Sequence, residues 1–235
     1  RYAAQKGMGG CYRRCAYRRI AVQKCKIRAW CPGDSRYQGE HQQQDFKFEI
    51  SDARKIAKTL SAFANTDGGR LLIGVKDNGK IAGVACEEEQ YMIQAAAEQY
   101  CKPGVVYSMQ TYCVNGKNVL LVEIAPSEKK PVYAQDDNGK FWAYVRVADE
   151  NILASPVHLQ MERQKQSIED ELVAFTEREQ RLLQLLQQYD TLSLNACCRK
   201  IDLPRKAVEQ LLAKLIRYEI VEPMFDGQKF HFRLK

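Results

Sequence analysis

The clearest hydrophobic pattern in the chain predicts a helix, a glycine turn and a buried strand. Three apolar residues recur at the three-to-four spacing of one helical face: Ile56, Leu60 and Phe63. Residues that suit a sharp backbone turn come next: Asn65, Gly68 and Gly69. The apolar run at 71–75 then predicts a strand buried on both faces. This order is typical of an α/β domain.

Further elements are predicted on both sides of this stretch. Apolar and charged residues alternate over 44–50, which predicts a strand with Phe46, Phe48 and Ile50 toward the core. Asn115-Gly116 between two β-rich runs predicts a hairpin. The other expected segments are a short return strand, a helix, a polar connection and a final strand, at 81–84, 87–101, 126–140 and 141–147.

The C-terminal pattern predicts a second, smaller domain. Ser155-Pro156 starts a linking helix, and Thr176 with Glu179 fits a capping box that marks a new domain. Three amphipathic helices and two short strands joined at Asp226-Gly227 predict a winged helix over 176–235. The chain therefore divides into a basic arm, an α/β domain, a linking helix and a winged helix, at 1–38, 39–155, 156–175 and 176–235.

The net charge of +7 is unevenly distributed. Residues 1–39 carry ten Lys and Arg against one Asp, a net +9; residues 40–175 carry fifteen against twenty, a net −5; residues 176–235 carry eleven against eight, a net +3. An acidic middle domain does not favour non-specific phosphate binding. Nucleic-acid contacts there need a local patch or a metal.

Composition also bounds the location. No run of about 18 apolar residues exists, so we expect no membrane span. The basic N-terminus lacks the apolar core of a signal peptide, and nine scattered cysteines indicate free thiols, so we expect a cytoplasmic protein.

The arm at 1–38 is ambiguous. Its arginine pairs and tyrosines could bind RNA or DNA, but a disordered tail is the favoured interpretation. Four cysteines lack any CxxC pair, which disfavours structural zinc: Cys11, Cys15, Cys25 and Cys31. The chain starts at Arg, not Met, and we assign no function to this arm.

Two motifs in the middle domain carry a resemblance. GEHQQQDFK at 39–47 and SAFANTDGGRLLIGVKDNG at 61–79 together resemble the Schlafen AlbA-type domain. That domain is the nucleic-acid-associated module of bacterial regulators and of Schlafen RNA nucleases. The resemblance covers roughly residues 39–158 and implies an α/β fold with a mixed sheet.

The resemblance also implies a catalytic hypothesis. Schlafen nucleases use three carboxylates, and the similar positions here are Glu40, Asp45 and Asp77, which would be both catalytic and metal-binding with Mg²⁺ or Mn²⁺. Two departures weaken it. Asp45 stands where the nucleases have Glu, and Lys76 precedes Asp77 where an acidic pair is common. Asp77 also begins an Asp-Asn-Gly turn. These features favour a protein that is not an enzyme.

Candidate nucleic-acid contacts come from both domains. Arg146 lies in a Tyr-Val-Arg-Val element that recurs at the end of the family's domain, where it could bind phosphate or form a salt bridge. The third helix of the winged helix would offer its exposed side to a major groove or to a protein. The full candidate set is Lys47, Arg146, Arg205, Lys206, Gln210, Lys214 and Arg217.

The sequence therefore favours a DNA-binding transcriptional regulator, most naturally a homodimer on a palindrome. A metal-dependent endoribonuclease acting on structured RNA and a protein-interaction or dimerisation module are the alternatives. The family has often been labelled ATP-binding, but GGRLLIG lacks the Gly-Lys-Ser/Thr end of a phosphate loop, so that label is doubtful here.

Overall fold

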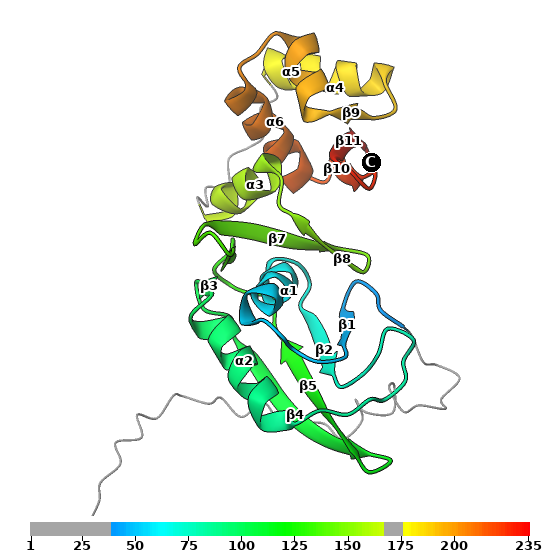
Figure 1. Ribbon diagram of the computed structural model, residues 1–235. Helices are drawn as coiled ribbons and strands as arrows, with labels where there is room; N and C mark the ends of the chain where they lie inside the picture. The colour runs from blue at the N-terminus through cyan, green and yellow to red at the C-terminus, as the bar shows by residue number, and fades with distance from the viewer. Residues whose placement is uncertain (1–38, 167–175) are drawn as a thin grey trace, which may run out of the picture. The chain divides into compact units, whose positions relative to one another are not determined.

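A computed structural model describes residues 39–166 and 176–235 (Figure 1). The predicted arm at 1–38, with its four cysteines, and the end of the predicted linking helix at 167–175 lie outside the described residues. Two separate hydrophobic cores are present, one before residue 155 and one after it. In the described part of the chain, no helix is long and apolar enough to cross a membrane.

The first core lies between a mixed sheet and two helices. The sheet has the order β1-β2-β5-β4, formed by β1 (Gln44–Lys47), β2 (Gly69–Ile73), β5 (Lys117–Ile124) and β4 (Tyr107–Val114). Strands β1 and β2 are parallel and the other pairs antiparallel. Asn115 and Gly116 turn the predicted β4–β5 hairpin with φ of 53° and 76°, as a tight hairpin turn requires.

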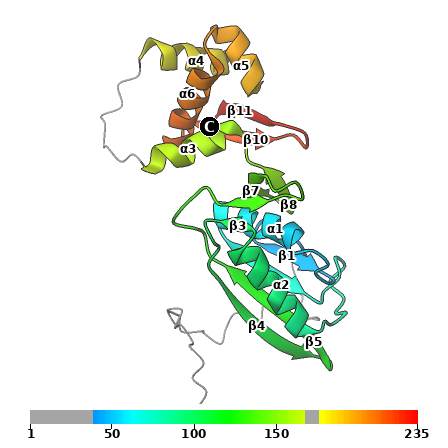
Figure 2. The ribbon, with the colours of Figure 1, turned by 60° about the vertical axis from the view of Figure 1, so that its left-hand side comes forward.

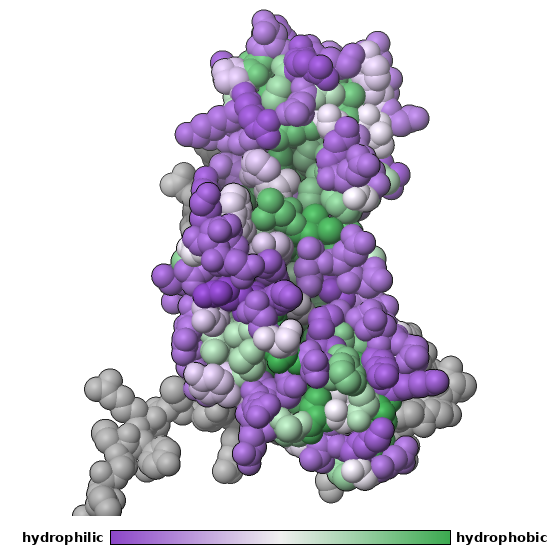
Figure 3. Space-filling model, in the orientation of Figure 1, coloured by the Kyte–Doolittle hydropathy of each residue, from purple (hydrophilic) through white to green (hydrophobic). Residues whose placement is uncertain are grey.

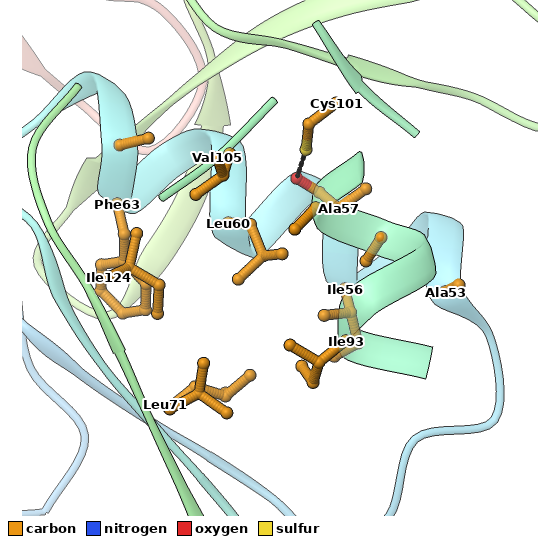
Figure 4. Close-up of a cluster of buried hydrophobic side chains, with 14 of the residues drawn as sticks. Ala53, Ile56, Ala57, Leu60, Phe63, Leu71, Ile93, Cys101, Val105 and Ile124 are labelled. Atoms are coloured by element: carbon orange, nitrogen blue, oxygen red, sulfur yellow. Dashed lines mark hydrogen bonds between the residues drawn. The ribbon is translucent and has the colours of Figure 1, made fainter. Parts of the chain in front are cut away.

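Helix α1 (Ala53–Asn65) fills the centre of this domain. The Asp52 carboxylate caps it by accepting a hydrogen bond from the Arg54 N–H at 2.8 Å. Its apolar side packs with β2, β5 and α2 (Cys86–Glu98), where Leu60, Leu71 and Ile93 are fully buried (Figure 4). Burial raises the pKa of the nearby Cys101 thiol to about 12, and the five described cysteines are free thiols.

A second sheet packs on the other side of α1. It has the order β3-β6-β7-β8, formed by β3 (Cys101–Lys102), β6 (Tyr133–Gln135), β7 (Phe141–Val147) and β8 (Glu150–Leu153). Two views place α1 between the two sheets (Figures 1 and 2). Strand β7 has the predicted bounds. The expected polar connection contains β6, and β8 was not predicted.

The prediction for 44–50 was wrong in its second half. Strand β1 ends at Lys47, and the side chain of Phe48 is 48% exposed. The Ile50 N–H does not continue the ladder because it donates to the Glu89 carboxylate at 3.0 Å. The return strand expected at 81–84 reduces to one bridge between Val75 and Ile81.

The second core belongs to a helical unit with a small sheet. Its elements are α3 (Pro156–Gln166), α4 (Glu177–Gln188), β9 (Leu192–Ser193), α5 (Leu194–Ile201), α6 (Arg205–Arg217), β10 (Val221–Phe225) and β11 (Phe230–Leu234). The sheet order is β10-β11-β9. Thr176 and Glu179 form the predicted capping box. Helix α3, predicted as a linker, buries Val157 completely in this core and packs against α6.

Candidate nucleic-acid interface

The amide of Asn65 joins the end of α1 to the second sheet. Its Nδ2 donates to the carbonyl oxygens of Val132 and Tyr144, both at 2.8 Å, and its Oδ1 accepts from the Val132 N–H at 2.7 Å. One turn earlier, the Ser61 hydroxyl donates to the same Val132 carbonyl at 2.8 Å. An amide supplies both donors and an acceptor, which a carboxylate cannot do. This contact fixes β7, and with it Arg146, over α1.

Gly68 and Gly69 leave no room for side chains in the turn that follows. Gly68 has φ of +72°, and a Cβ there would lie 2.6 Å from the Ile124 carbonyl oxygen. A Cβ at Gly69 would lie 2.5 Å from the ring of Phe63. The two glycines therefore allow β2 to start directly beneath the end of α1.

Asp45 lies beside Arg146 in the interior, and Glu40, a half-buried neighbour of Asp45, lies next to it. Asp45 is 3% exposed and Arg146 is 2% exposed. The Arg146 Nη2 lies 3.2 Å from the Asp45 Oδ1, and the Lys47 Nζ lies 2.8 Å from the Asp45 Oδ2. Arg146 also donates to the Asn151 Oδ1 at 2.9 Å and its guanidinium lies 5.1 Å from the Phe63 ring centroid. Arg146 therefore forms the salt bridge that the sequence left open, and its burial withdraws it from phosphate.

The local electrostatics follow from this burial. Burial and the neighbouring Asp45 carboxylate raise the pKa of Glu40, although the Phe46 N–H, which donates to its Oε1 at 2.9 Å, opposes the rise. Burial, with the charges of Arg70 and Arg146, lowers the pKa of His41, so this imidazole is neutral at pH 7.

The three predicted metal ligands do not fit a metal site. A divalent cation needs free carboxylate oxygens, but both oxygens of Asp45 already face cationic side chains. Asp77 is exposed in the turn after β2 and does not join Glu40 and Asp45. Within 39–166 and 176–235, no three His, Cys, Asp or Glu side chains gather as a metal-binding group. The expected catalytic triad is therefore not assembled in this structure.

The amine of Lys47, a predicted nucleic-acid contact, already has partners within the protein, one of which is Asp45. Its Nζ also donates to the Phe46 carbonyl oxygen at 2.8 Å, while 37% of the side chain stays exposed.

In the C-terminal unit, basic side chains gather where α5 meets α6. Asp202, with φ of 55°, lies in the short turn between these helices. Arg205 opens α6, and its guanidinium donates to the Asn195 Oδ1 at 2.8 Å and to the Glu209 Oε1 at 3.0 Å. A shallow pocket of about 390 Å³ lies here, lined by Asn195, Cys198, Arg199 and Arg205. Lys206 and Gln210 are exposed on the same half of α6.

The two other residues predicted on α6 make internal contacts. The Lys214 Nζ forms a 2.7 Å salt bridge with the Glu179 Oε1. Arg217 donates to the Gln164 carbonyl oxygen at 3.3 Å and to the Tyr218 hydroxyl at 2.9 Å. Both hold α6 against neighbouring helices. The prediction omitted Asn195 and Arg199, although their spacing of four residues places them on one face of α5.

The fold and the site together define the class of protein. It has a mixed α/β domain, in which Asn65 joins the central helix to the second sheet and Asp45 and Arg146 form a buried ion pair. A unit of helices with a small sheet follows this domain along the chain. Residues 40–155 match the family model described as Schlafen, AlbA_2, and this part of the chain belongs to that family. No curated protein sequence matches the chain.

Two solved structures are similar to parts of it. The DIP2311 protein from Corynebacterium diphtheriae is 22% identical, with a TM-score of 0.42, over 63% of this chain and 34% of that protein. The N-terminal domain of a protein from Nitrosomonas europaea, described as related to the ATP-dependent DNA helicase RecG, is 21% identical, with a TM-score of 0.35, over 58% of this chain and 86% of that domain. The match thus spans about a third of the length of the DIP2311 protein.

Proposed function

We propose that this protein binds duplex DNA as a regulator and that its C-terminal unit is a winged helix. The observation that carries the proposal is the group of exposed polar and basic side chains on α5 and on the first half of α6. This group, the α5–α6 surface, consists of Asn195, Arg199, Arg205, Lys206 and Gln210.

The order of elements supports this proposal. The chain order of α5, a short turn, α6 and the β10–β11 hairpin is the order that a helix-turn-helix with a wing would have. A helix of this kind fits the major groove with its N-terminal residues toward the bases. Lys229, exposed in the hairpin turn, could reach an adjacent phosphate.

The chemistry of each side chain suits a role in the groove. Arginine donates two parallel hydrogen bonds to guanine, and glutamine does the same for adenine. Arg205 is held by Asn195 and Glu209, so its guanidinium is oriented before DNA arrives. Arg199 and Lys206 supply positive charge to phosphate oxygens.

The test measures fluorescence anisotropy of a labelled duplex of mixed sequence, titrated with the full chain at several salt concentrations. The double variant Arg199→Ala/Lys206→Ala should bind about tenfold more weakly, with a shallower dependence of affinity on salt. A charge-matched control, Lys55→Ala/Lys129→Ala, removes two exposed lysines from the AlbA_2 domain. Equal losses in the two variants would show that only net charge matters, and would contradict the assignment of the α5–α6 surface.

We do not extend the proposal to catalysis, because the carboxylates that a metal-dependent nuclease would need do not fit a metal. A denaturing gel tests this point. When labelled RNA is incubated with the chain and Mn²⁺, we expect no RNA cleavage that depends on Asp45, so the wild type and Asp45→Ala should give the same band pattern.

A further inference from the structure

Strand β4 is a long edge strand without the features that usually protect such an edge. It lies at one end of the first sheet and pairs with β5 over all eight of its residues without a bulge (Figure 2). No other edge strand in the described residues has more than five residues. Natural sheets protect exposed edges with charged residues, proline, bulges or short strands. The sequence of β4, YSMQTYCV, contains no charged residue and no proline.

The strand is also poorly covered by the rest of the domain. None of its eight residues is buried, whereas four of the eight residues of β5 are buried. Edge strand β10 of the C-terminal sheet differs, because it contains Glu222 and Pro223. Hydrophilic residues cover most of the face in Figure 3. A strand edge needs no broad apolar patch for association, since its backbone N–H and C=O groups make the contact.

The hairpin turn determines which backbone groups of β4 face the open edge. In a two-residue turn the flanking residues, here Val114 and Lys117, exchange both of their hydrogen bonds, and such pairs alternate along the ladder. Asn118, opposite Cys113, agrees with this alternation, because its carbonyl oxygen accepts from the Val84 N–H at 3.0 Å, outside the β4–β5 ladder. The residues whose N–H and C=O groups point away from β5 therefore include Met109, Thr111 and Cys113.

We propose that β4 pairs with β4 of a second copy of this chain in antiparallel orientation, which joins the first sheets of the two copies into one. The pairing is centred on Gln110, so that nearly the whole strand is paired. Thr111 then lies opposite Met109 of the second copy, and Tyr112 lies opposite Ser108. Gln110 lies opposite its own equivalent, on the two-fold axis. The inference goes beyond the proposed function, because this dimer forms without DNA and uses other residues.

The chemistry of these pairs suits a second copy. No like charges meet across the two strands, because β4 carries none. The Gln110 Oε1 accepts a hydrogen bond from the Tyr112 hydroxyl. Its amide still has two donors and a second lone pair, so the two Gln110 side chains can bond to each other. A two-fold contact of this kind also closes on itself, because it leaves neither copy with a free β4 edge.

The expected dimer is weak. One pair of strands buries less surface than the roughly 800 Å² per partner of a standard stable interface. We therefore expect a dissociation constant of about 10–100 µM. The affinity should depend little on salt, since the paired strands are uncharged.

The test is sedimentation velocity of the full chain without DNA, at concentrations from about 1 to 500 µM. The wild type should shift from monomer to dimer. Gln110→Lys and Gln110→Glu should each weaken the dimer about three- to fivefold, because like charges then meet on the two-fold axis. An equimolar mixture of the two variants should recover the wild-type affinity, since unlike charges then meet. Gln184→Lys adds the same charge at an exposed position of α4 and should leave dimerisation unchanged.

Thr111→Pro gives a second test at the same edge. Its missing N–H faces the open side, so the substitution removes no hydrogen bond between β4 and β5. The variant should keep the circular dichroism spectrum of the wild type and stay monomeric at all of these concentrations. In the wild type, hydrogen exchange at the amides of Met109, Thr111 and Cys113 should slow as the protein concentration rises.

Three results would overturn the proposal. The wild type could stay monomeric throughout, or the mixture of Gln110→Lys and Gln110→Glu could associate no more tightly than either variant alone. Dimerisation only of a chain that starts at Gly39 would also contradict it, because residues 1–38 would then compete for the edge.

The test is independent of the proposed DNA binding. Arg199→Ala/Lys206→Ala should dimerise as the wild type does, whether or not it binds DNA. If this variant were monomeric, the copies would associate through the α5–α6 surface and the assignment to β4 would be wrong. Gln110→Lys that keeps its circular dichroism spectrum but loses the dimer would support β4, even if the wild type failed to bind duplex.

Discussion

At the scale of single residues, stability in the AlbA_2 domain depends on groups whose hydrogen-bonding chemistry has no close substitute. Asn65 holds two carbonyl oxygens and one N–H of the second sheet through a single amide. The buried Asp45 carboxylate is compensated by Arg146, which lies about a hundred residues further along the chain. Water cannot replace a lost partner at the buried Asp45 carboxylate, and the half-buried Asn65 amide satisfies three backbone atoms at once.

The first prediction concerns Asn65→Asp. The substitution keeps the size of the side chain but turns the two amide donors into an acceptor that faces two carbonyl oxygens. We expect the free energy of unfolding in urea at pH 7 to fall by about 2 kcal/mol or more. Asn118→Asp, at an exposed position of β5, is the control and should change stability by less than about 0.5 kcal/mol. Similar losses for both would contradict the role of the Asn65 amide.

The second prediction compares two glycine-to-alanine substitutions, to separate the cost of backbone strain at positive φ from the cost of a steric clash of the added Cβ. Gly68 and Gly116 both have positive φ, at 72° and 76°, but only Gly68 has backbone atoms where a Cβ would lie. Gly116→Ala should cost about 1 kcal/mol from strain alone. Gly68→Ala should cost roughly 1–3 kcal/mol more, because Ile124 or Pro126 must move. Urea unfolding curves would measure both, and equal losses would show that the close contacts at Gly68 relax freely.

The third prediction is a pH dependence from His158. Burial lowers its pKa from 6.5 to about 4, with an opposing effect from Glu162; its Nδ1 lies 2.7 Å from the Ser155 hydroxyl and its ring centroid 4.6 Å from that of Phe230. The unfolded chain therefore binds this proton more readily than the folded one. The contribution of neutral His158 is complete above pH 6.5 and is lost as the pH falls toward about 4. His158→Gln should flatten the stability curve between these values, and unchanged curvature would contradict the assignment.

At the scale of elements, the sequence pattern predicted correctly those helices and turns whose formation depends on residues close together in the chain. Helix α1, the β4–β5 hairpin and the capping box of α4 each follow from neighbouring residues. Strands β6 and β8 were missed because they are short and exist by pairing with β7. Phe48 was wrongly predicted to lie in the core because the alternation of apolar and charged residues continues to Ile50. The strand itself ends earlier, and the Ile50 N–H donates to the Glu89 carboxylate instead of to a neighbouring strand.

The candidate site was predictable to a similar extent. The helical period of α6 located Arg205, Lys206 and Gln210. It could not show that Lys214 would pair with Glu179, because that partner lies on another helix. The burial of Asp45 was equally hidden, since a charged residue on an alternating strand is typical of a solvent-facing side.

The fourth prediction concerns α3, which we infer belongs to the C-terminal folding unit. Val157 is fully buried there, and Met161 packs against the same core. A fragment of residues 155–235 should be more stable than one of 176–235 by about 2 kcal/mol, the value of one buried aliphatic side chain. Thermal unfolding followed by circular dichroism would measure the difference. Val157→Ser in the longer fragment should remove most of it, and equal stability of the two fragments would show that α3 only links.

At the scale of the whole molecule, most of the net positive charge is separated from the surface that we propose binds DNA. Residues 1–39 carry a net +9, whereas the rest of the chain has a net charge of −2. Attraction to phosphate in general should therefore depend on the first part of the sequence. Discrimination between DNA sequences should depend on the α5–α6 surface.

The fifth prediction tests this separation. A chain that starts at Gly39 should bind mixed-sequence duplex more weakly, with a salt dependence reduced by several phosphate contacts. The ratio of wild-type to Arg199→Ala/Lys206→Ala affinity should stay the same within about twofold, because independent contributions add as free energies. Anisotropy titrations of the four proteins would measure it. If the wild-type to variant affinity ratio fell to one in the chain that starts at Gly39, the effect of Arg199 and Lys206 would depend on residues 1–38, and the assignment to the α5–α6 surface would be wrong.

The open end of the β4–β5 hairpin has a practical use. A Cβ at Gly116 would meet no atom within 4 Å, and Asn115 and Gly116 are both exposed. Exposed hairpin tips accept added sequence more readily than the strands they join. A short epitope inserted between these two residues would report on the AlbA_2 domain without altering α6. Purification, imaging and surface immobilisation could then all use one internal position and leave both chain ends unmodified.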